Sequence, residues 1–245
     1  SSSGMNAAYT RYQKDAGIED SVELFISDTV AGGHDKNNAA LVEQLCSGSA
    51  AAVDWVAAHG LELSDVTSMA GASVARCHRP ADKTAVGANL VPALEAAVEA
   101  AGIEIVYETP ARELVVSDGA VCGVVVEDKG GSLSTHEAKA VVLATGGFAQ
   151  DRALLEKYLP DEVDVIKFCT AGAHGDGLTM AESLGAQIVP SGILGYLGAE
   201  WRFANFSDLR TPFHNGRASQ VIVNKEGKRF TSDAAGFNWT AYADL

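Results

Sequence analysis

The sequence has few of the residues that build disulfide-bonded or metal-bound proteins. It contains four cysteines among 245 residues. They are scattered as Cys46, Cys77, Cys122 and Cys169, with no CxxC pair and no CxxCH motif. This spacing excludes a zinc ribbon and a c-type haem site, and we expect no metal. We expect the four side chains to pack as small apolar groups.

Basic residues are also scarce, and no long apolar run is present. Lys and Arg number 18 against 32 Asp and Glu, a formal net charge of -14 that repels nucleic acids and anionic membrane surfaces. The strongest apolar stretch, residues 140–144, falls far short of the ~20 residues that cross a bilayer. We therefore expect no nucleic-acid partner and no membrane span. An anionic ligand must be held locally, by backbone N–H groups at helix starts or by a few Arg and His side chains.

Proline is rare, and the rest of the composition is that of a packed globular protein. Only 6 residues are proline, while 47% are hydrophobic and 20% are charged. This excludes collagen, coiled coil and low-complexity scaffolds. The chain opens on Ser1 without a targeting signal and ends at Leu245 without a terminal motif, so we expect a fragment.

Helical patterns dominate the first hundred residues. Asp20, followed by Glu23 three residues later, is typical of a capping box and predicts a helix that ends at Gly32 and Gly33. A second helix is predicted from Asn38 to His59, with Gly48 as a point of interruption. Its predicted apolar face consists of Leu41, Leu45, Ala52, Trp55 and Val56.

The fold class follows from the middle of the chain. The loop predicted over 69–85 leads into a helix from Gly87 to Ala101 and a strand at Ile103–Tyr107. Short strands and tight turns over 113–137 predict a β-meander, and the run 140–144 predicts a buried return strand. This order is typical of the second half of a nucleotide-binding α/β domain.

Two glycine motifs follow. Thr145-Gly146-Gly147 comes directly after the predicted return strand, where glycine lets the backbone approach a nucleotide; a tight turn without a ligand is the alternative. Gly175-Asp176-Gly177 opens a predicted helix that comes after a shorter helix beyond Asp151. Its N–H groups could hold a ligand oxygen, or Asp176 could simply cap the helix.

The amino-acid composition changes near residue 190, and we place a domain boundary there. Aromatic residues become frequent beyond it. A strand at Gln220–Asn224 is predicted to turn at Lys225–Lys228.

Several motifs together carry a family resemblance. They are Ser3-Gly4-Met5-Asn6-Ala7-Ala8, Gly71-Ala72-Ser73-Val74 with His78-Arg79-Pro80, Val141 to Phe148, Gly175-Asp176-Gly177, and Val223 to Phe230. In this order and approximate spacing they resemble the fumarate reductase flavoprotein family. The likeness is greatest to its soluble flavocytochrome c branch, which includes urocanate reductases, and it covers almost the whole chain.

The resemblance implies an α/β fold in two parts. Residues 1–190 would form a partial FAD-binding, Rossmann-like domain with a β-meander, and residues 191–245 the truncated start of an α+β capping domain. In the family, a βαβ unit that binds the FAD pyrophosphate precedes the Ser-Gly-Met-Asn segment. We therefore expect the fragment to bind FAD weakly or not at all and to be inactive alone. The resemblance implies a bacterial protein, either cytoplasmic or exported to the cell envelope.

The resemblance also implies the residues that hold FAD. Beside the isoalloxazine ring it places Ser2, Ser3, Gly4, Met5 and Asn6. It places Ala111 at the adenine, with ordinary strand packing as the alternative. Thr145, Gly146 and Gly147 would approach the adenosine, and Asp176 would lie near the floor of the site.

For the substrate side, the sequence departs from the family pattern. In family members that reduce an unsaturated acid, a capping-domain Arg delivers a proton to the alkene and a His binds the substrate. Here Phe237 stands in the place of the Arg, and Tyr196 in the place of the His. These departures argue against fumarate and toward a larger, less acidic or aromatic unsaturated acid, or an enone.

Five residues are candidates for catalysis or substrate binding: His78, Arg79, Tyr196, His214 and Arg217. The alternative for His78 and Arg79 is a surface His-Arg-Pro turn. Tyr196 could instead be a core aromatic residue, and the other two could be exposed loop residues.

The main hypothesis is an FAD-dependent oxidoreductase that reduces, or in reverse forms, a carbon–carbon double bond next to a carboxylate or carbonyl. The alternatives are a ketosteroid dehydrogenase-like flavoenzyme and a non-redox ligand-binding domain on the same scaffold. The sequence identifies no electron donor. A Gly-x-Gly-x-x-Gly loop encoded upstream of Ser1 would favour a flavoenzyme.

Overall fold

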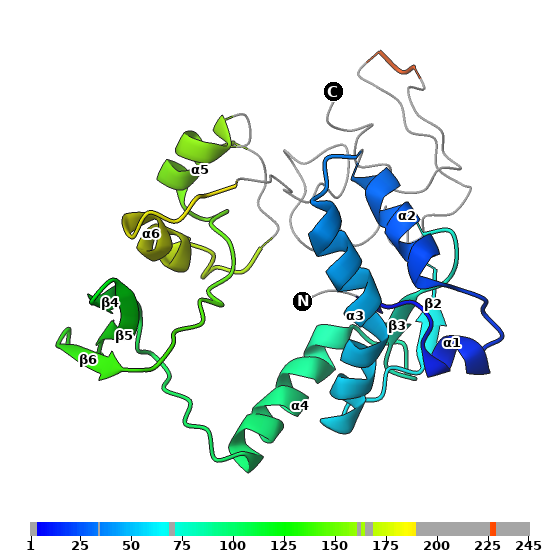
Figure 1. Cartoon of the computed structure of the whole chain (residues 1–245), viewed down its shortest axis with the longest axis horizontal. Coiled ribbons are helices and arrows are strands. Elements are labelled where there is room, and N and C mark those ends of the chain that lie inside the picture. Colours follow the sequence, from blue (N-terminus) through cyan, green and yellow to red (C-terminus); the bar gives the residue numbers. More distant parts are fainter. Residues whose placement is uncertain are drawn as a thin grey trace. The chain divides into compact units, whose positions relative to one another are not determined.

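The chain forms two compact units. One contains the residues up to Glu104, and the other begins at Ile105 (Figure 1). The computed structural model describes residues 4–33, 35–68, 72–160, 163–164, 169–189 and 226–228. The domain boundary expected near residue 190 falls where this description stops, and it stays a prediction.

The first unit combines four helices with a small antiparallel sheet. The helices are α1 (Arg11–Asp15), α2 (Val22–Gly32), α3 (Ala39–Ala58) and α4 (Val86–Ala100). The strands are β1 (Met5–Asn6), β2 (Asp65–Thr67) and β3 (Cys77–Arg79). Their order is β1-β3-β2, so the short strand β3 pairs on both edges.

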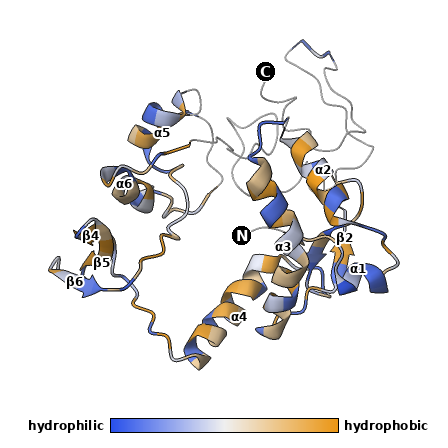
Figure 2. Cartoon of the chain, viewed as in Figure 1, coloured by the Kyte–Doolittle hydropathy of each residue, from blue (hydrophilic) through white to orange (hydrophobic). Residues whose placement is uncertain are grey.

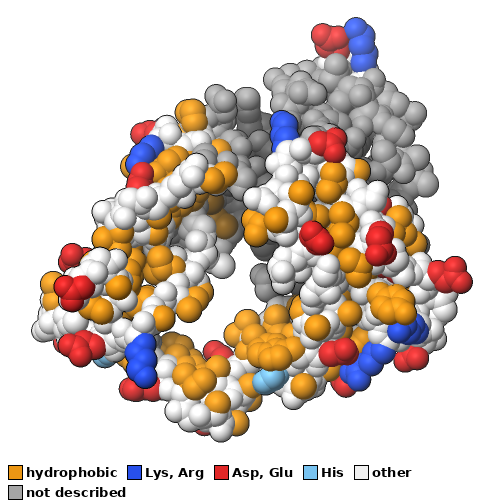
Figure 3. All heavy atoms as spheres, in the orientation of Figure 1, with side chains coloured by type: hydrophobic (Ala, Val, Ile, Leu, Met, Phe, Trp, Pro, Cys, Tyr) orange, Lys and Arg blue, Asp and Glu red, His pale blue; other side chains and the backbone are white. Residues whose placement is uncertain are grey.

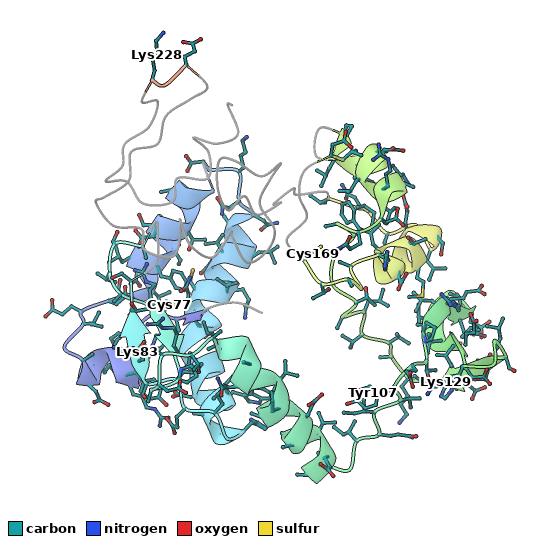
Figure 4. All side chains as sticks on the ribbon, turned by 180° about the vertical axis from the view of Figure 1, so that it is seen from behind. Cys77, Lys83, Tyr107, Lys129, Cys169 and Lys228 are labelled. Atoms are coloured by element: carbon teal, nitrogen blue, oxygen red, sulfur yellow. The ribbon has the colours of Figure 1, made fainter. Side chains whose placement is uncertain are left out.

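Strand β3 corrects the prediction of a loop over 69–85. Its residues, Cys77–Arg79, show no alternation of apolar and polar side chains. Such alternation marks a strand with one face exposed, whereas successive residues of this strand are buried. Cys77 and His78 are both buried, and Figure 4 labels Cys77 on the strand. Periodicity cannot reveal a three-residue strand whose polar side chains are satisfied inside the protein.

The helix starts follow capping chemistry. The Thr10 hydroxyl accepts a hydrogen bond from the backbone N–H of Gln13, and the Gln13 side chain returns to Thr10, which completes a capping box for α1. Helix α1 was not predicted, although its Thr-x-x-Gln signal is in the sequence. Helix α2 is confirmed, but its cap is Ser21, which accepts from the N–H of Leu24. Asp20 is wrong as the cap, because its carboxylate binds an arginine instead.

Helix α3 is confirmed from its Asn38 cap to the left-handed Gly60 beyond its end, and Gly48 does not interrupt it. Its predicted apolar face is confirmed at Val56 and is otherwise displaced by about one residue. The side chains that turn inward are Val42, Cys46, Ser49, Val53 and Val56. Three of the predicted members are exposed, namely Leu41, Leu45 and Trp55, and Figure 3 shows apolar side chains at the surface over α2 and α3.

The core of the first unit lies along α3. One cluster joins Phe25 on α2 to Val42 and Cys46. A second cluster brings Leu63 and Val86 against the other end of α3. Helix α4 contributes partly buried side chains to this second cluster, and it is apolar over much of its length (Figure 2). It ends before Gly102, as predicted.

The second unit contains the predicted β-meander. Strands β4 (Ala111–Ser117), β5 (Ala120–Glu127) and β6 (Leu133–Glu137) form an antiparallel sheet in this order. Asp118 and Gly119 connect β4 to β5, and both have positive φ. A two-residue loop with positive φ at both positions matches the twist of the strands it joins.

Two predicted strands are wrong. Residues 103–107 and 140–144 are not strands in the structure. Figure 4 labels Tyr107 in the extended segment that follows α4. Val142 is 88% exposed rather than buried. Both runs have the composition of strands that are covered on two faces, but a strand also needs neighbours to pair with. No strand of the described part of the chain pairs with either run.

The described part of the second unit also contains two helices. Helix α5 (Arg152–Tyr158) confirms the short helix predicted beyond Asp151, and Asp151 is its cap, which accepts from the N–H of Leu154. Helix α6 (Asp176–Ser183) also begins where the glycine motif predicts. Of the later predictions, only 226–228 are described, and they lie in a turn with positive φ at Gly227, as predicted.

Candidate functional site

The segment expected beside the isoalloxazine ring lies in close contact with β3. A Cβ atom on Gly4 would lie 2.1 Å from the sulfur of Cys77 and 3.1 Å from the His78 carbonyl oxygen, so a larger residue fits only if the Cys77 side chain or the strand moves. Met5 pairs with His78, and Asn6 with Cys77. Ser2 and Ser3 lie outside the described residues.

His78 is an internal residue, and the alternative of a surface turn is wrong for it. Its ring is fully buried. Nδ1 lies 2.8 Å from the Arg76 carbonyl oxygen, which can only accept, so Nδ1 carries the proton. Nε2 then accepts from the Thr10 hydroxyl at 2.7 Å. Burial lowers the pKa of His78, and the hydrogen bond to Arg76 opposes this only in part.

This arrangement uses both ring nitrogens of His78 within the protein. A general acid or base must reach the proton it transfers, within hydrogen-bond distance or through one water. His78 therefore has a structural role in this geometry, and as a catalytic residue it stays a prediction. Its neighbour Arg79 is partly buried and binds Asp65 through Nε at 3.0 Å and Nη2 at 2.8 Å.

Sequence reasoning missed the buried ion cluster around Arg76. The Arg76 side chain is 1% exposed, and it binds Asp20 through Nε at 2.9 Å and Nη2 at 2.7 Å. Nη1 donates to Asp28 on α2, and the guanidinium lies 4.8 Å from the ring centre of Phe25. The two carboxylates lie 56 and 48 residues from Arg76 in sequence, so no local pattern joins them. The only sign of this cluster in the sequence is Arg76, which follows a run of small residues.

The carboxylates of this cluster are held in their charged form. Burial raises the pKa of Asp20, but hydrogen bonds from Arg76 and Gln13 outweigh it, so the pKa lies below the ordinary value. The pKa of Asp28 is lowered in the same way, where burial is outweighed by hydrogen bonds from Ser73 and Arg76. The cluster is thus an internal ion triad in which one guanidinium pairs with two carboxylates, so that its own charges sum to -1.

In the second unit, the structure brings the two glycine motifs together. The backbone N–H of Gly175 donates to the Gly147 carbonyl at 3.1 Å. The N–H of Gly177 donates to the Thr145 hydroxyl at 3.2 Å. The two motifs are about 30 residues apart in sequence, and their contact gives one small-residue surface.

Steric contacts and backbone conformation restrict these positions to glycine. Gly175 has φ of 75°, and a Cβ there would lie 2.5 Å from Leu154 and 2.8 Å from Phe148. A Cβ on Gly177 would lie 2.4 Å from the Thr145 hydroxyl oxygen. Gly146 also has positive φ, yet its Cβ position is open. An exposed backbone with open space beside it suits the close approach of a flat ligand.

The remaining predicted site residues of this unit are placed as follows. Asp176 is the first residue of α6 and is exposed; the cap is Gly175, with no side-chain bond, so the reading of Asp176 as a cap is wrong. Ala111 opens β4 opposite Val126 and is partly buried. Tyr196, His214 and Arg217 lie outside the residues that the structure describes.

The four cysteines differ in burial, and Cys122 is partly buried. Cys46 and Cys77 are buried, as expected for small apolar side chains, and burial raises the pKa of the Cys77 thiol. Cys169, labelled in Figure 4, is exposed, which corrects that expectation for this residue. Within the described ranges, no group of three or more His, Cys, Asp or Glu side chains could hold a metal ion. The helices described here are all too short or too polar to span a membrane.

A family model described as an FAD binding domain matches residues 1–242. The chain belongs to this family. FAD is accordingly its cofactor, and the predictions of a flavoprotein with a fumarate reductase-like sequence are confirmed.

Sequence relatives of this FAD-binding-domain protein are named for the reduction of unsaturated acids. It is 37% identical to a fumarate reductase (cytochrome) of Shewanella frigidimarina, over 94% of this chain and 40% of the relative. It is 34% identical to an NADH:fumarate oxidoreductase of Klebsiella pneumoniae, over 95% of this chain and 25% of the relative. A urocanate reductase of Eggerthella lenta is 30% identical, over 91% of this chain and 37% of the relative. The chain spans well under half the length of these three proteins.

The fold also matches solved flavoproteins. An open conformation of a flavocytochrome c3 fumarate reductase aligns with a TM-score of 0.74 and 37% identity, over 76% of this chain and 33% of that one. A 3-ketosteroid dehydrogenase of Rhodococcus jostii aligns with a TM-score of 0.69 at 24% identity, over 76% of this chain and 46% of that one. The second likeness shows a shared fold alone. The partial FAD-binding α/β fold is confirmed, and the capping domain stays a prediction.

The residues present fit FAD. Gly146 offers exposed backbone with positive φ and open space beside it, and Gly4 lies so near Cys77 that an added Cβ atom would meet its sulfur. The chain carries a net charge of -14, so a dinucleotide anion must be met by local dipoles rather than by the overall field. The N-terminus of α6, adjoining Thr145-Gly146-Gly147, supplies such dipoles.

Proposed function

We propose that this chain is part of an FAD-dependent oxidoreductase that reduces a carbon–carbon double bond next to a carboxylate or carbonyl, or forms it in reverse. The observation that carries the proposal is the similarity, over more than 90% of the chain, to proteins named as fumarate and urocanate reductases. A further relative, at 32% identity over 87% of the chain, is named NADH:acrylate oxidoreductase. The substrates named share an alkene conjugated to a carboxylate.

Under this proposal, the described residues bind and orient the cofactor. Gly4, Met5 and Asn6 would border the isoalloxazine ring, and Thr145-Gly146-Gly147 with the start of α6 would hold the adenosine side. When bound, FAD supplies the hydride for the reduction of the double bond. The chain's own contribution is to hold these backbone segments in place and to leave no room for other side chains at Gly4 and Gly175.

The substrate that we propose is an aromatic or otherwise larger unsaturated acid, or an enone, rather than fumarate. Tyr196 stands where the family resemblance expects a substrate-binding His, and Phe237 where it expects the Arg proton donor. A pocket built around aromatic rings leaves the carboxylates of a small dianion unpaired. Each uncompensated contact of a buried charge costs about 2–5 kcal/mol.

The proposal is tested by mixing the reduced, full-length gene product anaerobically with unsaturated compounds in a stopped-flow instrument. We expect urocanate, aryl-acrylates or enones to restore the oxidised flavin absorbance faster than fumarate does. Faster reoxidation by fumarate would overturn the substrate assignment while leaving the oxidoreductase intact. A full-length product with no flavin absorbance, even after incubation with FAD, would overturn the proposed function as a whole.

A further inference from the structure

Strand β1 makes few bonds of its own. It consists of Met5 and Asn6, and it pairs with β3 alone. So short a ladder has little stability by itself. The next two residues, Ala7 and Ala8, are nonetheless fully buried. The position of β1 therefore depends on β3, with which it pairs, and on α3, where Ser49 accepts a hydrogen bond from the N–H of Ala8.

Strand β3 is anchored by a closed ring of hydrogen bonds that begins and ends at Arg76. The Arg76 guanidinium binds Asp20, which also accepts from the side-chain amide of Gln13 at 2.8 Å. The Gln13 amide oxygen accepts from the backbone N–H of Thr10. The Thr10 hydroxyl donates to His78, whose other nitrogen returns to the Arg76 carbonyl. The ring ties α1 and β3 together.

Arg76 also reaches α2 and the β1 segment directly. Its Nη1 donates to Asp28 on α2, and its carbonyl oxygen accepts from the backbone N–H of Ala7 at 3.0 Å. Asp28 is held in turn by the backbone N–H of Ser73 at 2.9 Å. One residue thus connects β1, α2 and the segment before β3.

Stability alone does not explain such a cluster. The desolvation of buried ions offsets much of their attraction, and well-packed apolar residues in their place are often as stable or more so. The best-attested use of a buried ionic group is to select one arrangement of the chain. The arginine fork on a carboxylate fixes orientation in a way that lysine cannot.

We propose that Arg76 is a positioning residue for the flavin, and that its ion cluster with Asp20 and Asp28 fixes β1 at the edge of the isoalloxazine ring. The inference rests on the proposed function, because only there does β1 border the flavin. The Arg76 side chain is 1% exposed, so it acts through β1 and not by contact with cofactor or substrate.

The test uses Arg76→Lys and Asp20→Asn in the full-length flavoprotein. Lysine keeps the charge but loses the fork, and asparagine keeps the shape but loses the charge. We expect both variants to fold, the FAD dissociation constant to rise about tenfold, and the visible circular dichroism of the bound flavin to change. A purely structural role would lower the melting temperature without changing the flavin's spectrum.

Arg11→Lys is the matched control. Arg11 lies on the neighbouring helix α1, is 52% exposed, and pairs with Asp54 and Glu62 at the surface. We expect it to leave FAD affinity and flavin dichroism unchanged. Folded Arg76→Lys and Asp20→Asn proteins with wild-type affinity and dichroism would overturn the inference; if the lysine variant does not fold, the asparagine variant alone decides. A wild-type protein that binds no flavin would instead overturn the proposed function.

Discussion

His78 and Arg76, in the interior of the first unit, have a partner for each of their polar side-chain groups. His78 has a donor partner and an acceptor partner, and Arg76 has two carboxylates. Such matching is what makes burial of polar groups tolerable, because an unmatched one costs about 1–3 kcal/mol. It also makes the unit sensitive to protonation, since a proton added to His78 would meet the Thr10 hydroxyl in its donor orientation.

His78 predicts a pH dependence of stability. Its folded-state pKa is lowered by burial, so the unfolded state binds the proton first as the pH falls. Stability is therefore full above about pH 6.5, the unfolded value, and is lost on acidification toward the folded value, by at most about 1.4 kcal/mol per pH unit. Urea unfolding followed by circular dichroism across this range measures the slope.

The variant that tests this is His78→Asn, which keeps a donor and an acceptor but does not titrate. We expect it to flatten the slope below about pH 6.5. His136→Asn, on the exposed strand β6, is the matched control and should keep the wild-type slope. An unchanged slope in His78→Asn would assign the pH dependence elsewhere.

Among the helices and strands, α3 shows most clearly that packing determines which of two apolar faces of a helix is buried. Its sequence offers one apolar row through Leu41, Leu45 and Trp55, and a second row through Val42, Cys46 and Val53. Either row repeats at helical spacing. The second row is buried, because α2 and the residues around Ala8 lie on that side.

We predict unequal effects of truncating the two rows. Val53→Ala, at a fully buried position, should lower the free energy of unfolding by about 1–3 kcal/mol through lost contacts and a residual cavity. Leu45→Ala, at a position 60% exposed, should change it by less than about 0.5 kcal/mol. Denaturant titration of the two variants compares them; equal losses would mean that the Leu45 row is also covered in solution.

At the scale of the whole molecule, the net charge limits which groups can bind the cofactor. The net charge of -14 opposes a dinucleotide anion, so affinity must come from backbone dipoles at helix starts and glycine-rich turns. The described residues supply one such surface, at Thr145-Gly146-Gly147 and the start of α6. The resemblance assigns the pyrophosphate to a βαβ unit that precedes the Ser-Gly-Met-Asn segment.

We therefore predict that residues 1–245 by themselves retain little FAD after purification, whereas the same residues joined to such a βαβ unit retain it. Pyrophosphate capture by a glycine-rich loop and a helix N-terminus supplies a large part of dinucleotide affinity. The ratio of flavin to protein absorbance measures retention in both. A stoichiometric flavin spectrum from the 245 residues alone would contradict the prediction.

Local patterns were enough to predict five of the six described helices and the meander, and the family resemblance carried by the motifs was enough to predict the cofactor. Capping residues and 3.6-residue spacing act within a few positions, so α2, α3, α4, α5 and α6 could be read with small errors at their starts. The meander could be read because Asp118-Gly119 demands a tight turn between two β-branched runs. The glycine motifs in their order implied FAD, and the family match confirms it.

Strand β3 and the Arg76 cluster could not be predicted in this way, because they depend on contacts between residues far apart in the sequence. Strand β3 exists because residues from before α1 and after α3 lie on its two edges, and the Arg76 cluster joins groups about 50 residues apart. The runs 103–107 and 140–144 show the converse, since β composition without a neighbouring strand does not make a strand. Periodicity reports which side chains share a face, but hydrogen bonds and ion pairs between distant segments form only where the folded chain brings their partners into reach.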